Sequence, residues 1–191
     1  MGYLIGDDMA LLHPPKTAGL WARRACEIVG LPWVRYGDQH SDDPPPGGRY
    51  AMVFVRHPVA WLKSFWMFHE RTGWEQYNDE PGFIFYANHR AGESFPDFVA
   101  RYLDKMPGAI GRMFGRYERN AERVGKVETI RPDMRRFIAE RHPEIDTSEI
   151  DRMAQSNVSP GPQRLAVNFA AGQREAICLA ENDFMSTRGY E

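Results

Sequence analysis

Short apolar runs alternate along this chain with stretches in which apolar residues recur at helical spacing. Continuous apolar runs at residues 9–13 and 50–55 predict two buried strands. A helical pattern follows each run, at 20–30 and at 58–70, and Pro58 suits the first turn of the second helix. Strands that alternate with helices favour an α/β fold with three layers, α/β/α, around a mostly parallel central sheet.

The remaining segments continue this alternation and add a long segment with no period. The pattern predicts a short strand at 33–36, a weaker strand at 124–130, and helices at 95–103, about 110–123, 132–141, 147–155 and 171–185. The Pro- and Gly-containing segments 37–49 and 157–164 are expected to be loops. Residues 71–94 are rich in Gly, Asn and aromatic side chains, which indicates either a lid that binds an acceptor or a loop anchored to the core. We expect one domain spanning 1–191.

Composition narrows the class of protein. The chain has 191 residues and a formal net charge of −2, which argues against broad nucleic-acid binding by bulk electrostatics. Asp7 and Asp8 interrupt the N-terminal segment where a signal peptide needs apolar residues, and no apolar run approaches the length of a membrane span. Cys26 and Cys178 are expected to be reduced thiols, and no Cys/His spacing suggests a metal site. These features predict a cytoplasmic protein with no metal, nucleic-acid or membrane partner.

The segment 9–21, MALLHPPKTAGLW, has the pattern of a strand, a tight loop and a helix N-terminus. The start of a helix presents backbone N–H groups and the positive end of the helix dipole to an anion. Lys16 adds a positive charge and Thr17 a hydroxyl donor, while His13 beside the loop is expected to pack against it or orient it. The segment therefore predicts a site for a phosphate or sulfate group.

A second segment, 53–64, repeats this order of elements with the sequence VFVRHPVAWLKS. Arg56 follows the apolar strand directly, and Ser64 lies on the helix that begins at Pro58. Ligands of open α/β sheets bind beyond the carboxyl ends of the strands, so Lys16 and Arg56 should project toward one edge. The planar guanidinium of Arg56 suits bidentate contact with a second phosphate.

These two motifs resemble those of sulfotransferases that use 3′-phosphoadenosine 5′-phosphosulfate (PAPS), particularly the carbohydrate-type and small microbial members. In that family a Pro-Lys-Thr-Ala/Gly-Gly-Thr-Ser segment after a strand holds the 5′-phosphosulfate. The matching positions here are Pro15, Lys16, Thr17, Ala18 and Gly19, followed by Leu20 and Trp21. An Arg-x-Pro segment with a Ser eight positions after the Arg holds the 3′-phosphate, as Arg56, Pro58 and Ser64 would here.

The resemblance implies a P-loop-like fold, PAPS as the donor, adenosine 3′,5′-bisphosphate as the product and no metal. It also implies a hydroxyl acceptor on a carbohydrate or small molecule. Lys16 would neutralise the charge that develops on the transferring group, and a His or Glu between the motifs would act as the base. His40 and Asp38 are the candidates for that base. Arg164 is a further candidate contact to the 3′-phosphate.

The chain departs from the family pattern at Leu20 and Trp21, which replace two hydroxyl residues that normally help to hold the 5′-phosphate. Either Lys16 and the backbone N–H groups suffice, or the site is weakened, or the donor differs. One alternative is therefore a relative that binds a nucleotide without turnover. Another is a P-loop-like small-molecule or nucleoside kinase, against which the missing G-x-x-x-x-G-K-[ST] pattern argues.

Overall fold

The computed structural model describes residues 2–37, 42–72, 92–154 and 167–190. The chain divides into two compact units. One comprises Met1–Arg56 with Met113–Pro160, and the other comprises His57–Arg112 with Gly161–Glu191.

The first unit holds a five-stranded sheet in the order β3-β1-β2-β4-β5. The strands are β1 (Gly2–Ile5), β2 (Met9–Leu12), β3 (Trp33–Tyr36), β4 (Tyr50–Val55) and β5 (Arg123–Lys126). β4 pairs in parallel with both β2 and β5, whereas β1 runs antiparallel to β2 and β3. The sheet is therefore mixed, where the sequence led us to expect a mostly parallel one.

A tight hairpin explains this difference. The sequence did not predict β1, because its short apolar run starts at Gly2 and is followed directly by Gly6 and Asp7, residue types that are depleted in strands. Residues 6–8 join β1 to β2, and Gly6 in this turn has a φ of 57°, a left-handed conformation that glycine adopts at little cost. The turn returns the chain at once, so β1 lies between β2 and β3.

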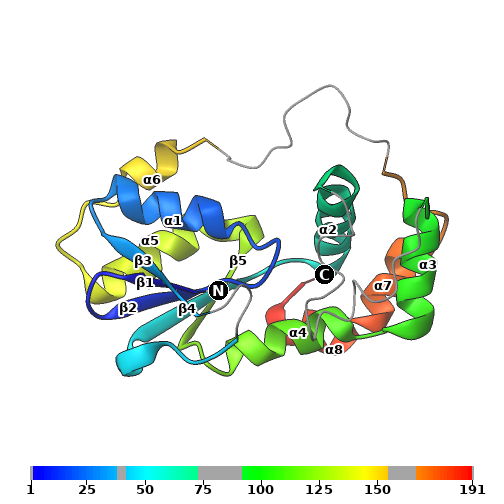
Figure 1. Cartoon of the computed structure of the whole chain (residues 1–191), viewed down its shortest axis with the longest axis horizontal. Coiled ribbons are helices and arrows are strands. Elements are labelled where there is room, and N and C mark those ends of the chain that lie inside the picture. The colour runs from blue at the N-terminus through cyan, green and yellow to red at the C-terminus, as the bar shows by residue number, and fades with distance from the viewer. Residues whose placement is uncertain (1, 38–41, 73–91, 155–166, 191) are drawn as a thin grey trace. The chain divides into compact units, whose positions relative to one another are not determined.

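One face of the sheet packs against α1 (Gly19–Ile28), α5 (Ile130–Arg141) and α6 (Glu149–Arg152), which gather beside the strands in Figure 1. Alternate strand residues supply the sheet side of this core: Tyr3, Ile5, Met9, Leu11, Met52 and Phe54. The helices contribute Trp21, Ala25, Phe137 and Ile150, among others. Burial of these apolar surfaces is the main stabilising term of the first unit.

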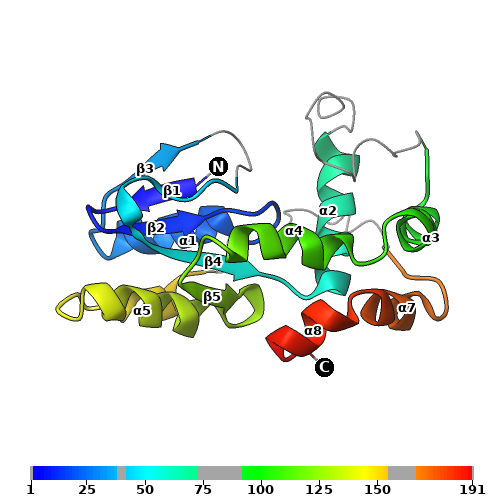
Figure 2. The ribbon, with the colours of Figure 1, turned by 90° about the horizontal axis from the view of Figure 1, so that it is seen from below.

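The second unit is helical in the residues that the structure describes. Its helices are α2 (Pro58–Thr72), α3 (Phe95–Lys105), α7 (Gln173–Ala180) and α8 (Asn182–Arg188), and it includes the first turn of α4 (Ala109–Glu118). In Figure 2, α7 continues into α8 after a break, where the sequence predicted one helix over 171–185. The break lies at Glu181, which is 2% exposed.

The buried Glu181 carboxylate connects three parts of the second unit. It accepts hydrogen bonds from the Tyr102 hydroxyl, the Ile110 N–H at 3.1 Å and the Gly111 N–H at 2.8 Å. The two N–H groups belong to the first turn of α4, where intrahelical partners are lacking. Burial raises the pKa of Glu181 above its usual value, although the hydrogen bonds from Tyr102 and the backbone oppose that shift.

Other predicted elements are confirmed in kind, but two are shorter than expected: the strand predicted at 124–130 ends at Lys126 as β5, and the helix predicted at 147–155 is the four-residue α6. The predicted loop 157–164 lies outside the described residues. The strands β3 and β4 have the predicted bounds, and α2 extends to Thr72. Arg71 and Thr72 therefore belong to a helix and not to the predicted loop 71–94, whose residues 73–91 lie outside the described part. Within the described residues, no helix combines the length and apolar character needed to cross a membrane.

Candidate functional site

The loop from Pro14 to Ala18, between β2 and α1, contains left-handed backbone at two residues. Lys16 has a φ of 63° and Ala18 a φ of 59°, and they are the non-glycine residues with positive φ in the described ranges. The left-handed conformation costs an L-residue about 1–2 kcal/mol, so the contacts around the loop must impose it. Strained backbone of this kind is concentrated at ligand-binding sites, which makes this loop the first candidate.

Thr17 stabilises the loop from the inside. Its side chain is 1% exposed, and its hydroxyl donates a 2.7 Å hydrogen bond to the Pro14 carbonyl oxygen. The hydroxyl that the sequence offered as a donor is thus engaged within the loop. The sequence carries a signal for this bond, because a threonine hydroxyl often donates to the backbone carbonyl three positions before it.

The helix α1 begins directly at the end of this loop. The Ala18 carbonyl accepts the first helical hydrogen bonds, from Trp21 N at 2.9 Å and Ala22 N at 3.0 Å. The N–H groups of Gly19 and Leu20 precede these bonds and lie at the positive end of the helix dipole. Leu20 is 49% exposed beside them, whereas Trp21 is buried in the core.

Arg56 reaches this loop from the neighbouring strand. β2 and β4 are parallel with Leu12 opposite Val53, so both strands end at the same edge of the sheet. Arg56, directly after β4, places its Nη1 3.4 Å from the Lys16 carbonyl oxygen, to which it donates. The structure thereby places the Arg56 guanidinium against the backbone of Lys16, so the two residues that the sequence assigned to one edge are neighbours there.

This arrangement is suited to an anion. Two side-chain cations, Lys16 and Arg56, and the N-terminus of α1 belong to one edge of the first unit. Both side chains belong to half-buried residues, where a charge interaction is screened less than at a fully exposed position. A phosphate or sulfate group offers oxygen acceptors to all three features at once.

The structure tells less about the other predicted site residues. Pro15 and Gly19 are buried in the loop and helix start. Ser64 is a half-buried residue of α2 in the second unit, so its predicted role beside Arg56 stays a prediction. Asp38, His40 and Arg164, proposed for the base and for a phosphate contact, lie outside the described residues.

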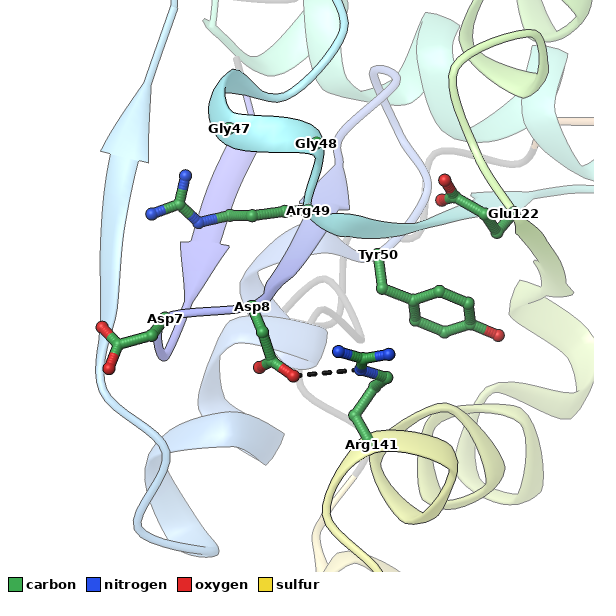
Figure 3. Close-up of a pocket in the computed structure, with 8 residues that line it drawn as sticks. All are labelled: Asp7, Asp8, Gly47, Gly48, Arg49, Tyr50, Glu122 and Arg141. Atoms are coloured by element: carbon green, nitrogen blue, oxygen red, sulfur yellow. Dashed lines mark hydrogen bonds and ion pairs between the residues drawn. The ribbon is translucent and has the colours of Figure 1, made fainter.

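A separate cavity of about 260 Å³ lies at the opposite edge of the sheet, where β2 and β4 begin. Figure 3 shows the residues that line it: Asp7, Asp8, Gly47, Gly48, Arg49, Tyr50, Glu122 and Arg141. Two of its carboxylates are engaged by protein groups: Asp8 accepts from Arg141 Nε at 2.9 Å, and Glu122 accepts from the Ala51 N–H at 2.6 Å. Neither Lys16 nor Arg56 is among the residues that line this cavity.

Comparisons with known proteins complete the description. No family model matches the chain, and neither does any curated protein or solved structure. Across the described residues, no group of three or more His, Cys, Asp or Glu side chains is placed to hold a metal ion. The features of this chain that point to a function are therefore the residues at the carboxyl ends of β2 and β4 and the two motifs that contain them.

Proposed function

We propose that this chain is a sulfotransferase, which moves a sulfuryl group from PAPS to a hydroxyl of a carbohydrate or small-molecule acceptor. The single observation that carries the proposal is the contact of Arg56 with the Lys16 backbone, which joins the two motifs at one sheet edge. A donor with phosphate groups at both its 3′ and 5′ positions needs two cationic contacts, and this pair supplies them. A three-layer, P-loop-like arrangement around the sheet is part of the same proposal.

The proposed reaction is an in-line displacement at sulfur. The acceptor oxygen forms a bond to sulfur while the bond from sulfur to the 5′-phosphate oxygen breaks, and adenosine 3′,5′-bisphosphate leaves. The acceptor proton passes to one of the two candidate bases, His40 or Asp38. Lys16 and the N-terminus of α1 stabilise the charge that develops on the leaving phosphate, so positioning and electrostatics supply the catalysis.

A second candidate function is nucleotide binding without transfer. Leu20, exposed at the first turn of α1, supports it, because an apolar side chain stands where a hydroxyl would donate to the 5′-phosphate. In this case PAPS and the bisphosphate product would bind, but no sulfuryl group would reach an acceptor. Transfer of labelled sulfate from PAPS to a panel of hydroxyl acceptors separates the two candidates.

We also propose that the protein acts in the cytoplasm. Both cysteines are free thiols, with Cys26 buried among apolar residues and Cys178 partly buried. Burial raises the pKa of Cys26 to about 12, so this thiol stays protonated and unreactive at neutral pH. Free thiols of this kind are typical of proteins in reducing compartments.

Thermal unfolding with and without adenosine 3′,5′-bisphosphate tests the donor site. Ligand at a hundred times its dissociation constant should stabilise the fold by about 2.7 kcal/mol, which raises Tm by about 5–10 °C. ATP with Mg²⁺ should give a much smaller shift. Absence of any shift at millimolar bisphosphate would contradict the proposal, and a larger shift with ATP and Mg²⁺ would favour a kinase.

Matched variants connect the shift to the two motifs. Lys16→Ala and Arg56→Ala should each reduce it by more than half, because each removes a charge-assisted contact to a phosphate. Lys105→Ala and Arg136→Ala remove the same charges from exposed positions on α3 and α5, and should leave the shift unchanged. Equal losses in all four variants would indicate a nonspecific effect of net charge.

A further inference from the structure

The ring of His13 occupies the space that a side chain at Gly19 would need. A Cβ built at Gly19 would lie 2.1 Å from His13 Cδ2 and 2.2 Å from His13 Nε2, which is far inside van der Waals contact. Gly19 is the first residue of α1, and it is not among the glycines with positive φ. The requirement for glycine here thus comes from the ring of His13 and not from the backbone conformation.

The ring is supported from its other side by the sheet. Side chains two residues apart on a strand point to the same face of the sheet. His13, two residues after Leu11 and four after Met9, therefore continues the row of side chains that faces α1. The Tyr3 ring, 2% exposed, lies with its centroid 5.6 Å from that of His13 at an interplanar angle of 34°. Trp33 packs edge-on against Tyr3 at 5.5 Å. His13 is therefore held between a packed strand and the start of the helix.

We propose that His13 is a positioning residue of the anion site, an inference that rests on the proposed function. Its ring sets the distance between the end of β2 and the first turn of α1, and so fixes where the Gly19 and Leu20 N–H groups point. Backbone strain such as that at Lys16 and Ala18 persists only where the surroundings impose it. The hydrogen bond from Thr17 to Pro14 closes the loop from the inside, and the contact of His13 with Gly19 joins the two residues that flank the loop.

A shape role and a direct ligand contact predict different results at His13. If the ring acts by filling space, a flat apolar ring should replace it. If a ring nitrogen donates to the bound anion, no apolar ring can do so. The size of the side chain at residue 19 can be changed independently, because the backbone conformation of Gly19 accepts alanine.

The experiment measures the dissociation constant of adenosine 3′,5′-bisphosphate by titration calorimetry for the wild type, His13→Ala, His13→Phe, Gly19→Ala and the double variant His13→Ala/Gly19→Ala. Urea unfolding without ligand is measured in parallel, and binding is measured only where each variant is folded. We expect His13→Ala to weaken binding at least tenfold and His13→Phe to stay within about threefold of the wild type. Gly19→Ala should lose both stability and binding, and the double variant should regain much of each.

The outcomes separate this inference from the proposed function. A wild type that does not bind the bisphosphate overturns the proposed function, and this inference with it. A wild type that binds, with His13→Ala binding within twofold, overturns the positioning role alone. Loss of binding in a folded His13→Phe variant assigns His13 a direct contact and also overturns the shape role. If His13→Phe does not fold, the double variant is compared with Gly19→Ala. Tighter binding in the double variant supports the positioning role of His13, and equally weak binding overturns it.

Discussion

The Thr17 hydroxyl and the Pro14 carbonyl oxygen, 2.7 Å apart, close the bend through which β2 enters α1. Both groups are buried, so neither can exchange this hydrogen bond for one with water. The bond therefore stabilises the loop conformation as well as the fold. Its removal is a direct way to ask how far the left-handed residues of the loop depend on it.

Thr17→Val should destabilise the protein by about 1–2 kcal/mol, because it keeps the shape of the side chain but leaves the Pro14 carbonyl without its donor. Thr17→Ser, which retains the hydroxyl, should lose less. Urea unfolding gives both values. Valine at full wild-type stability would show that the hydrogen bond contributes nothing to the loop.

Ala18 tests the backbone strain itself. Ala18→Gly should stay within about 0.5 kcal/mol of the wild type, because relief of the left-handed strain offsets the greater entropy of glycine in the unfolded chain. Ala18→Val should lose more than about 1 kcal/mol, since a β-branched residue is a severe outlier at positive φ. Chemical denaturation of both variants checks the order, and a valine variant as stable as glycine would contradict the left-handed assignment.

The Glu181 carboxylate allows a prediction for the second unit. Glu181→Ala should cost about 2–4 kcal/mol, because it leaves two N–H groups of α4 and the Tyr102 hydroxyl without an acceptor. Amide hydrogen exchange at Ile110 and Gly111 should accelerate. Glu175→Ala, an exposed position on α7, is the control and should change little.

The ion pair between Asp8 and Arg141, where β2 and β4 begin, is expected to make the stability of the protein depend on pH. Burial opposes ionisation of Asp8, but hydrogen bonds from Arg141 and the charge of His142 outweigh it and lower the pKa of Asp8. Its folded pKa lies below the unfolded value, so its stabilisation is complete above about pH 4 and is lost as the pH falls through the folded pKa. Asp8→Asn should cost about 0.5–1 kcal/mol at neutral pH, since the pair is partly exposed.

The control for this pair is Asp7→Asn, an exposed carboxylate in the same turn. Urea unfolding of the wild type and both variants at neutral and acidic pH gives the comparison. The deficit of Asp8→Asn should shrink toward acidic pH and in 1 M salt, which screens the pair. A deficit independent of both would assign the loss to packing.

Leu20 offers a gain-of-function prediction that depends on the proposed function. Leu20→Thr places a hydroxyl at an exposed position in the first turn of α1, where a phosphate would accept from it. The affinity for adenosine 3′,5′-bisphosphate should rise about tenfold, the effect of one added hydrogen bond to a charged group. Calorimetry measures it, with Ile28→Thr on the same helix as the control; weaker binding would contradict it.

Local signals predicted the elements that local sequence determines. The apolar run of β4 and the proline that opens α2 placed both elements closely, because neither depends on distant partners. The contact of Arg56 with the Lys16 loop followed from the same logic, since parallel neighbours end at one edge. The sequence alone was therefore enough to predict that Lys16 and Arg56 belong to the same end of the sheet.

The features that could not be predicted from the sequence depend mostly on contacts between residues far apart in the chain. The strand β1 gains its partners only when Gly6 turns the chain, and it changes the sheet from parallel to mixed. The break at Glu181 reflects partners 70 to 79 positions away in the sequence. Left-handed backbone at Lys16 and Ala18 has no signal in residue type, because such positions usually select glycine or asparagine.

The hairpin of β1 and β2 also protects the chain from association. Since β1 covers one side of β2 and β4 the other, the apolar residues 9–12 have no open backbone edge. Deletion of residues 2–5 would leave that edge unpaired and ready to add a strand from another molecule. The four residues of β1 thus guard against aggregation, and shortened versions of the protein should retain them.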